Sequence, residues 1–210
     1  MNFLRKHWFD LGGVFAVIVL IYTFTTYKDL TQYQTLMWFS LVSLFLHQFE
    51  EYRIPGTFPG MLNKVLYKSN LPDRYPLNPN SAFYINVLIG WNLYLLAALL
   101  SEKAIWLGIA TILISLGNVI AHTFLFNIKG RTIYNAGMLT TWLLFVPCIY
   151  YFFSTTQTVH LATKTDYLIG IPLGIIMNVV GVLKAIQWMA DEKTIYRFNN
   201  RNLLYEDRIQ

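Results

Sequence analysis

Long apolar runs separated by short polar segments make up most of this 210-residue chain. A helix needs about 20 consecutive apolar residues to cross the hydrocarbon core of a bilayer. Six runs approach or exceed that length, at about 8–27, 33–52, 82–101, 104–126, 134–154 and 167–189. The pattern predicts an all-α polytopic integral membrane protein, in which residues 1–210 form one domain of six transmembrane helices.

The longest predicted connection is the segment 53–81, which holds five of the seven prolines. Its middle is apolar at Phe58, Met61, Leu62 and Leu66, a spacing typical of a short amphipathic helix that lies on a membrane surface. We expect this segment to cover the cytoplasmic end of the helices.

The composition agrees with a membrane protein. Charged residues make up 13% of the chain, whereas a typical soluble domain carries about 25%. The single cysteine, Cys148, excludes an intrachain disulfide and a thiolate metal cluster. The net charge of +5 would indicate nucleic acid only if the basic residues gathered on a soluble face. We therefore expect membrane lipids, and no nucleic acid, as partners.

The basic residues divide unevenly between the two sides of the predicted spans. Lys28, Lys103 and Lys164 fall in loops on one side, and the other 13 of the 16 lysines and arginines fall toward the opposite side. Lysine and arginine concentrate on the cytoplasmic side of membranes. Both termini are therefore predicted to be cytoplasmic, in the plasma membrane or the inner membrane of a bacterium.

A costly polar cluster ends the second predicted span. His47, Glu50 and Glu51 follow an apolar run, and a charged group inside a span costs roughly 2.5–3.5 kcal/mol on insertion scales. Helix positions three and four apart share a face, so these side chains project together. Asn118 and His122 share a face by the same rule, and the predicted topology places them at nearly the same depth.

Two imidazoles and two carboxylates at one depth predict a divalent metal site held by His47, Glu50, Glu51 and His122. Zinc suits such a site and lowers the pKa of its bound water to about 7, while iron or manganese also accepts these ligands. In the catalytic scheme one glutamate binds the metal, the other is the general base, and Asn118 orients a ligand or an oxyanion. Without metal, the adjacent carboxylates would share a proton and one would activate water directly.

Three further polar residues lie in the cytoplasmic halves of their spans and are expected to support the site: Asp10, Asn86 and Asn135. Polar residues in membrane bundles also commonly form interhelical hydrogen bonds with no catalytic role. That structural alternative stays open for Asp10 and Asn86.

These motifs together resemble the HXXEE membrane-protein family. The naming motif is His-Gln-Phe-Glu-Glu at 47–51, a Pro/Gly-rich segment follows it, and the second histidine and its asparagine are His122 and Asn118. A YNPG-like element appears as Tyr-Asn-Ala-Gly at 134–137, with alanine in place of proline. The resemblance covers much of the chain and implies a membrane enzyme built on these polar residues, without naming its reaction.

The sequence favours a metal-dependent hydrolase that acts on a lipid or another membrane-embedded substrate at the cytoplasmic leaflet, with redox chemistry at non-haem iron as a variant. Its cavity would lie between the second and fourth spans, under the segment 53–81. The second hypothesis is a proton- or cation-coupled small transporter that uses Glu50 and Glu51 as a relay. A purely structural or receptor role is the third.

Overall fold

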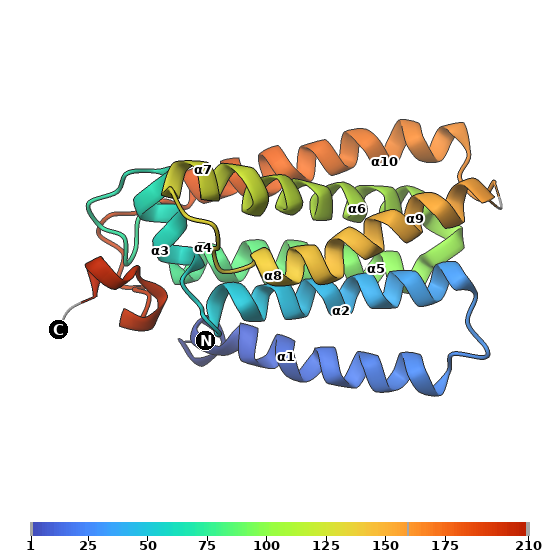
Figure 1. Ribbon diagram of the computed structural model, residues 1–210, viewed down its shortest axis with the longest axis horizontal. Helices are drawn as coiled ribbons and strands as arrows, with labels where there is room; N and C mark the ends of the chain where they lie inside the picture. Colours follow the sequence, from blue (N-terminus) through green and yellow to red (C-terminus); the bar gives the residue numbers. More distant parts are fainter. Residues whose placement is uncertain (1, 159, 209–210) are drawn as a thin grey trace.

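Helices account for all the regular secondary structure in the computed structural model, which describes residues 2–158 and 160–208 (Figure 1). No strand occurs in those ranges, which confirms the predicted all-α class. A helix satisfies its own backbone hydrogen bonds, so it suits apolar segments that have no water around them. The long helices run along one common direction, and the first and last described residues lie at the same end of the bundle.

The first two long helices are α1 (Asn2–Thr25) and α2 (Gln32–Tyr52). The later long segments mix α-helical and π-helical turns. In chain order they are α4 (Pro79–Phe83), the π segment Tyr84–Trp91 and α5 (Asn92–Leu100); α6 (Ile105–Ile120), the π segment Ala121–Leu125 and α7 (Phe126–Gly130); α8 (Met138–Thr140), the π segment Thr141–Phe145 and α9 (Val146–Thr158); α10 (Lys164–Ile176), the π segment Met177–Lys184 and α11 (Ala185–Trp188). Shorter elements are α3 (Phe58–Gly60), the π segment Met61–Leu66 and the 3₁₀ turns Ser101–Ala104, Asn200–Asn202 and Tyr205–Asp207.

Within the described residues, four helical segments are long and apolar enough to cross a membrane: Phe3–Thr25, Pro79–Gly130, Met138–Thr158 and Lys164–Trp188. This number supports membrane association but differs from the six predicted. One reason is that Pro79–Gly130 has 52 residues and reverses direction at Ser101, where φ is 45°, so that α5 and α6 lie side by side (Figure 1). The other is that α2, although 21 residues long, is less apolar because it ends in the polar motif.

The helix α2 is enclosed by the others. It contacts α1, α5 and α9, and its Leu41 and Phe45 pack into a core with Ala16 of α1 and Phe145. By contrast, α1 and α10 leave large apolar side chains exposed, as a lipid-facing surface would. Because α2 is enclosed, the polar residues at its C-terminal end are buried against other helices.

The segment 53–81 contains the short helix that the sequence predicts, but its apolar face packs against the end of the bundle. Met61 and Leu62 are buried with Leu77 and Phe126. The Asn63 side chain fastens the loop, because its Nδ2 donates to the carbonyl of Leu77 at 2.8 Å and its Oδ1 accepts from the Leu77 amide at 2.9 Å.

The C-terminal segment is attached to the same end of the bundle. The buried Asn202 Nδ2 donates to the carbonyl oxygens of Tyr52 at 2.9 Å and Gly56 at 2.8 Å. Tyr52 directly follows the polar motif of α2, and Gly56 lies in the segment that leaves this helix. Gly60 also packs directly against the C-terminal segment, since a Cβ at this position would lie 2.7 Å from the Leu204 amide nitrogen.

Candidate metal centre

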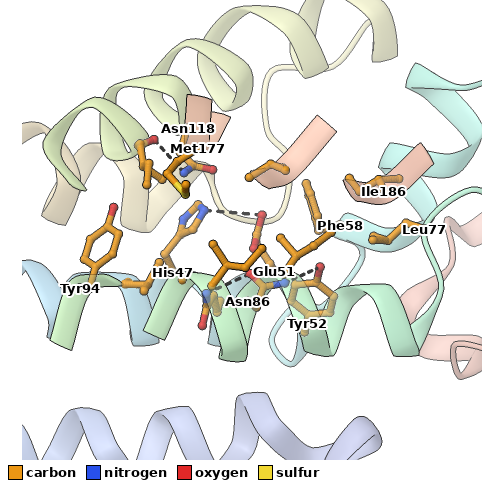
Figure 2. Close-up of a pocket in the computed structure, with 17 residues that line it drawn as sticks. His47, Glu51, Tyr52, Phe58, Leu77, Asn86, Tyr94, Asn118, Met177 and Ile186 are labelled. Atoms are coloured by element: carbon orange, nitrogen blue, oxygen red, sulfur yellow. Dashed lines mark hydrogen bonds and ion pairs between the residues drawn. The ribbon is translucent and has the colours of Figure 1, made fainter. Parts of the chain in front are cut away.

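Three buried side chains from two separate helical segments meet at the C-terminal end of α2. His47 and Glu51 lie one helical turn apart on α2, and His122 comes from the π segment that follows α6. The Glu51 Oε1 lies 3.5 Å from His47 Nε2 and 3.3 Å from His122 Nε2. The three potential ligand atoms all lie within 4.8 Å of one another, and the side chains of these residues are 1–6% exposed. Figure 2 shows His47 and Glu51 pointing toward each other.

The hydrogen bonds of Asn135 determine the tautomer of His122. The Asn135 Nδ2 donates to the His122 carbonyl at 2.8 Å and to Asn127 Oδ1 at 2.7 Å. Its Oδ1 is therefore the acceptor for His122 Nδ1, at 2.6 Å. In the neutral imidazole, a proton on Nδ1 leaves the Nε2 of His122 unprotonated, and this atom faces Glu51.

A chain of hydrogen bonds from Glu50 does the same for His47. A carboxylate only accepts hydrogen bonds, so the Thr140 hydroxyl donates to Glu50 Oε2 at 2.5 Å. The Thr140 oxygen is then the acceptor for His47 Nδ1, at 3.1 Å. In the neutral imidazole of His47, Nε2 is therefore also unprotonated, and it too faces Glu51.

Glu50 is the predicted ligand and general base that the structure does not bring into this group. Its Oε1 accepts from the Tyr134 hydroxyl at 2.7 Å and from the Leu139 amide at 3.2 Å, and its Oε2 accepts from the Thr140 amide at 2.8 Å. These amides belong to the first turn of α8, where backbone N–H groups lack helical partners and attract anions. Glu50 is therefore turned away from Glu51 and fastens the start of α8 to α2.

The turn at Gly137 fits against both imidazoles. Its φ of +104° favours glycine. A Cβ there would also lie 2.8 Å from His122 Nδ1 and 2.9 Å from His47 Cε1. A side chain at this position would thus displace both candidate ligands.

A cavity of about 100 Å³ runs beside His47 and Glu51 (Figure 2). Asn118 and Asn86 both line it, from α6 and from the π segment Tyr84–Trp91. Asn118 donates to the Ile114 carbonyl in its own helix at 3.1 Å. The cavity thus lies between α2 and α6, as predicted, but the segments Tyr84–Trp91 and Met177–Lys184 also form its wall.

A comparison with protein families gives a match over residues 38–152 to a family described as a protein of unknown function with HXXEE motif. The chain belongs to this HXXEE family. The match includes His47, Glu50, Glu51, His122 and the turn at Gly137. Neither the curated proteins nor the solved structures yielded a significant match.

The geometry in this HXXEE protein suits a cation. In the neutral imidazoles, both Nε2 atoms and the Glu51 oxygen are acceptors that face one another, and His47 Nε2 is buried without a hydrogen-bond partner within the described part of the chain. Buried acceptors without a donor are costly. Two ligand atoms bound tetrahedrally at about 2.0–2.1 Å from zinc would be about 3.4 Å apart, close to the 3.5 and 3.3 Å found. The His-Glu-His group could hold a metal ion.

Of the three supporting residues predicted from the sequence, two lie at the candidate site or its cavity and one does not. Asn135 contacts His122, and Asn86 lines the cavity and donates to the Ala82 carbonyl at 2.9 Å. Asp10 does not join them: it is paired with Arg53 at 2.9 Å and His7 at 2.9 Å, near the surface. Its charge is neutralised locally, which explains its place in an otherwise apolar helix.

The prediction missed the roles of Tyr134 and Thr140. Tyr134 and Gly137 belong to the YNPG-like element, so the motif pointed to the correct turn without saying what it contacts. Nothing in the sequence pattern distinguished Thr140, because a single threonine in an apolar helical segment is common.

Proposed function

We propose that this HXXEE-family protein is a metal-dependent intramembrane hydrolase of a lipid or other membrane-embedded substrate, with His47, Glu51 and His122 holding zinc. The observation that carries the proposal is that the Glu51 Oε1 lies 3.5 Å from His47 Nε2 and 3.3 Å from His122 Nε2, with all three potential ligand atoms within 4.8 Å of one another in a buried site. Two histidines and one glutamate are a ligand set of catalytic zinc sites that keep a position open. The same set accommodates non-haem iron or manganese.

The proposed setting is a six-span membrane domain with both termini in the cytoplasm, in the plasma or bacterial inner membrane. The reversal at Ser101 divides the 52-residue segment into two rods, and the 21 residues of α2 are long enough to span about 30 Å. The distribution of basic residues supports the orientation.

In this proposal the site performs hydrolysis from a largely apolar cavity. A bound zinc ion supplies Lewis acidity and an activated water. Asn118 lines the cavity, and we assign it the role of holding a substrate carbonyl oxygen. Water adds to the acyl carbon, the ester C–O bond breaks, and the proton of the water ends on the leaving alcohol. Glu50 orients His47 through Thr140 rather than taking that proton.

The transport hypothesis requires Glu50 and Glu51 to exchange protons or cations together. Both oxygens of Glu50 already accept hydrogen bonds from Tyr134 and the first turn of α8. Moving a charge on or off Glu50 would release α8 from α2. The geometry therefore favours a fixed positioning role for Glu50 over a relay.

Elemental analysis of the purified protein tests the metal centre. After exposure to zinc, iron or manganese, the wild type should retain about one metal ion per chain, because one group of three protein ligands binds one ion. The variants His122→Ala and Glu51→Gln should lose it. His7→Ala is the matched control, because His7 pairs with Asp10 near the surface.

Absence of metal from the wild type under all three loading conditions, or equal retention by His122→Ala, would contradict the metal centre. Release of fatty acid from single-chain and two-chain lipid esters, each presented in vesicles, then tests the reaction. A protein that retains metal and releases no product from a panel of lipid esters would keep the metal centre and lose the hydrolase assignment.

A further inference from the structure

The polar groups along the cavity differ in whether their hydrogen bonds are already made. Gln48 donates to Asn86 Oδ1 at 3.0 Å and accepts from the Trp91 indole at 2.6 Å, so this part of the wall offers little free polarity. The remaining wall is mostly aliphatic, including Leu44, Ile85, Ile89, Ile114, Val182 and Ile186. The end of the cavity at His47 and Glu51, which the proposed function assigns to the metal ion, is therefore the polar region to which a ligand head would be drawn.

The size of the cavity limits what it can hold. A buried water occupies roughly 10–15 Å³ of this kind of volume and about 30 Å³ of liquid. The cavity of about 100 Å³ therefore corresponds to about 7–10 waters, or roughly 200–300 Å³ of liquid. Drug-sized ligand pockets begin near 300 Å³. One narrow chain fits this space, whereas a fused ring system or a second acyl chain does not.

The cavity wall includes a seam between two π segments, Tyr84–Trp91 and Met177–Lys184. A Cβ added to Gly181 would lie 3.8 Å from Ile89 Cγ2, so the two segments approach each other at a glycine. On the outer side of the seam, Leu88 is 48% exposed and Val180 is 38% exposed. In a bilayer, these side chains would face the acyl chains of lipids.

We infer that the cavity takes one unbranched alkyl chain of a membrane amphiphile, which enters through this seam and places its polar head at His47, Glu51 and Asn118. The inference rests on the proposed function for its chemistry, and it narrows the substrate class to single-chain acyl esters. Two-chain phospholipids and sterols are excluded by size.

Gly90 provides the variant that fills the cavity. It lines the cavity, and a Cβ there would find its nearest atom, the Ile85 carbonyl oxygen, at 3.6 Å. Gly90→Ala and Gly90→Leu should therefore fold and reduce the space in two steps. Val180→Leu enlarges a side chain on the outer side of the same seam and is the matched control.

The experiment is photocrosslinking of a fatty acid that carries a mid-chain diazirine, in phosphatidylcholine vesicles. The label should appear in the wild type within residues 84–91 and 177–186. Labelling should be about tenfold lower in Gly90→Leu and intermediate in Gly90→Ala, because each methylene of the ligand that is kept out of the cavity lowers the affinity. Val180→Leu should match the wild type. Excess lysophosphatidylcholine should compete, and cholesterol should not.

Equal labelling of wild type and Gly90→Leu, or competition by cholesterol as effective as by lysophosphatidylcholine, would overturn the inference. Metal content is measured on every variant, and Gly90→Leu should retain it. His122→Ala should lose metal and still be labelled. Loss of the metal centre and loss of the chain site therefore give different results.

Discussion

At the scale of single residues, the candidate centre depends on side chains that never touch the metal position. Asn135 and Thr140 each receive the Nδ1 proton of one histidine, which leaves both Nε2 atoms free. Partners of this kind fix the ring orientation of metal-binding histidines, and their loss typically costs 10–100-fold in metal affinity. The segment that begins at Tyr134 thus orients both histidines through hydrogen bonds to their Nδ1 atoms.

Asn135→Ala should weaken zinc binding by about 10–100-fold, because His122 loses the acceptor for its Nδ1 proton. Competition against a chelator of known zinc affinity measures the change. Asn92→Ala is the control, since Asn92 is exposed and bonds only to its own helix, at the Val87 and Leu88 carbonyls. Unchanged affinity in Asn135→Ala would show that the tautomer of His122 is set by something else.

Gly137→Ala should both destabilise the protein and reduce metal retention. The left-handed backbone alone costs a non-glycine residue roughly 1–2 kcal/mol, and the new Cβ would press on His47 and His122. Thermal unfolding in detergent and elemental analysis give the two readouts. Gly90→Ala, which has room for a methyl group, should change neither by a comparable amount.

The sequence predicted His47, Glu51 and His122 as partners, because helical spacing and the positive-inside rule placed them at one depth. It could not separate Glu50 from Glu51. Adjacent residues on a helix differ by about 100° in direction, and only the packing of α8 against α2 decides which carboxylate faces His122. That contact joins positions 90 residues apart, such as Glu50 and Thr140, so no local pattern encodes it.

At the scale of elements, π-helical turns surround the candidate site. One carries His122, another begins at Thr141, and two more form the seam of the cavity. Such turns are frequent at functional sites, and they change the direction of the side chains that follow them. The apolar pattern predicted a span at 104–126, and the helices there run to Gly130, but hydrophobicity alone does not reveal a π turn.

The opposite end of the bundle gives a prediction about pH. Partial burial raises the pKa of Glu102, but hydrogen bonds from Thr31 and Gln34 outweigh this effect and leave the pKa below its ordinary value of 4.5. A lowered pKa in the folded state contributes stability above pH 4.5, and that stability is lost as the pH falls through the folded-state pKa.

Between about pH 6 and about pH 3, the thermal midpoint of Glu102→Gln should therefore fall less than that of the wild type. Glu192→Gln, at an exposed position, is the control and should follow the wild type. The contribution is small because Glu102 is largely solvated and its charge is screened. An equal fall of the thermal midpoint in all three proteins would show that Glu102 does not contribute to the loss of stability at low pH.

At the scale of the whole molecule, the all-α class and the presence of helices apolar enough to cross a membrane followed from hydropathy, because a helix satisfies its own backbone hydrogen bonds without water. The number of spans was harder to obtain. The predicted boundary between 82–101 and 104–126 coincides with the reversal at Ser101, but the helical segment continues through it, so one 52-residue segment is found there in place of two spans. The packing of Met61 and Leu62 into the bundle end also depends on distant residues, including Leu77 and Phe126.

The proposed orientation can be tested with single cysteines introduced after Cys148→Ala has removed the only native thiol. A membrane-impermeant maleimide should label Lys28→Cys in intact cells and Lys193→Cys only after the membrane is opened. Both positions are exposed. The reverse pattern would invert the topology, and labelling of both in intact cells would exclude an odd number of spans between them, and with it the proposed five.

The attachment of Asn202 to Tyr52 and Gly56 has a practical consequence for anyone who trims or tags this protein. The region matched by the family ends at residue 152, yet a fragment cut there would lose the amide that closes off the end of α2 directly behind Glu51. Deleting the last ten residues, or fusing a bulky partner to them, would disturb the hydrogen bonds that Asn202 makes to Tyr52 and Gly56, and through them the position of Glu51.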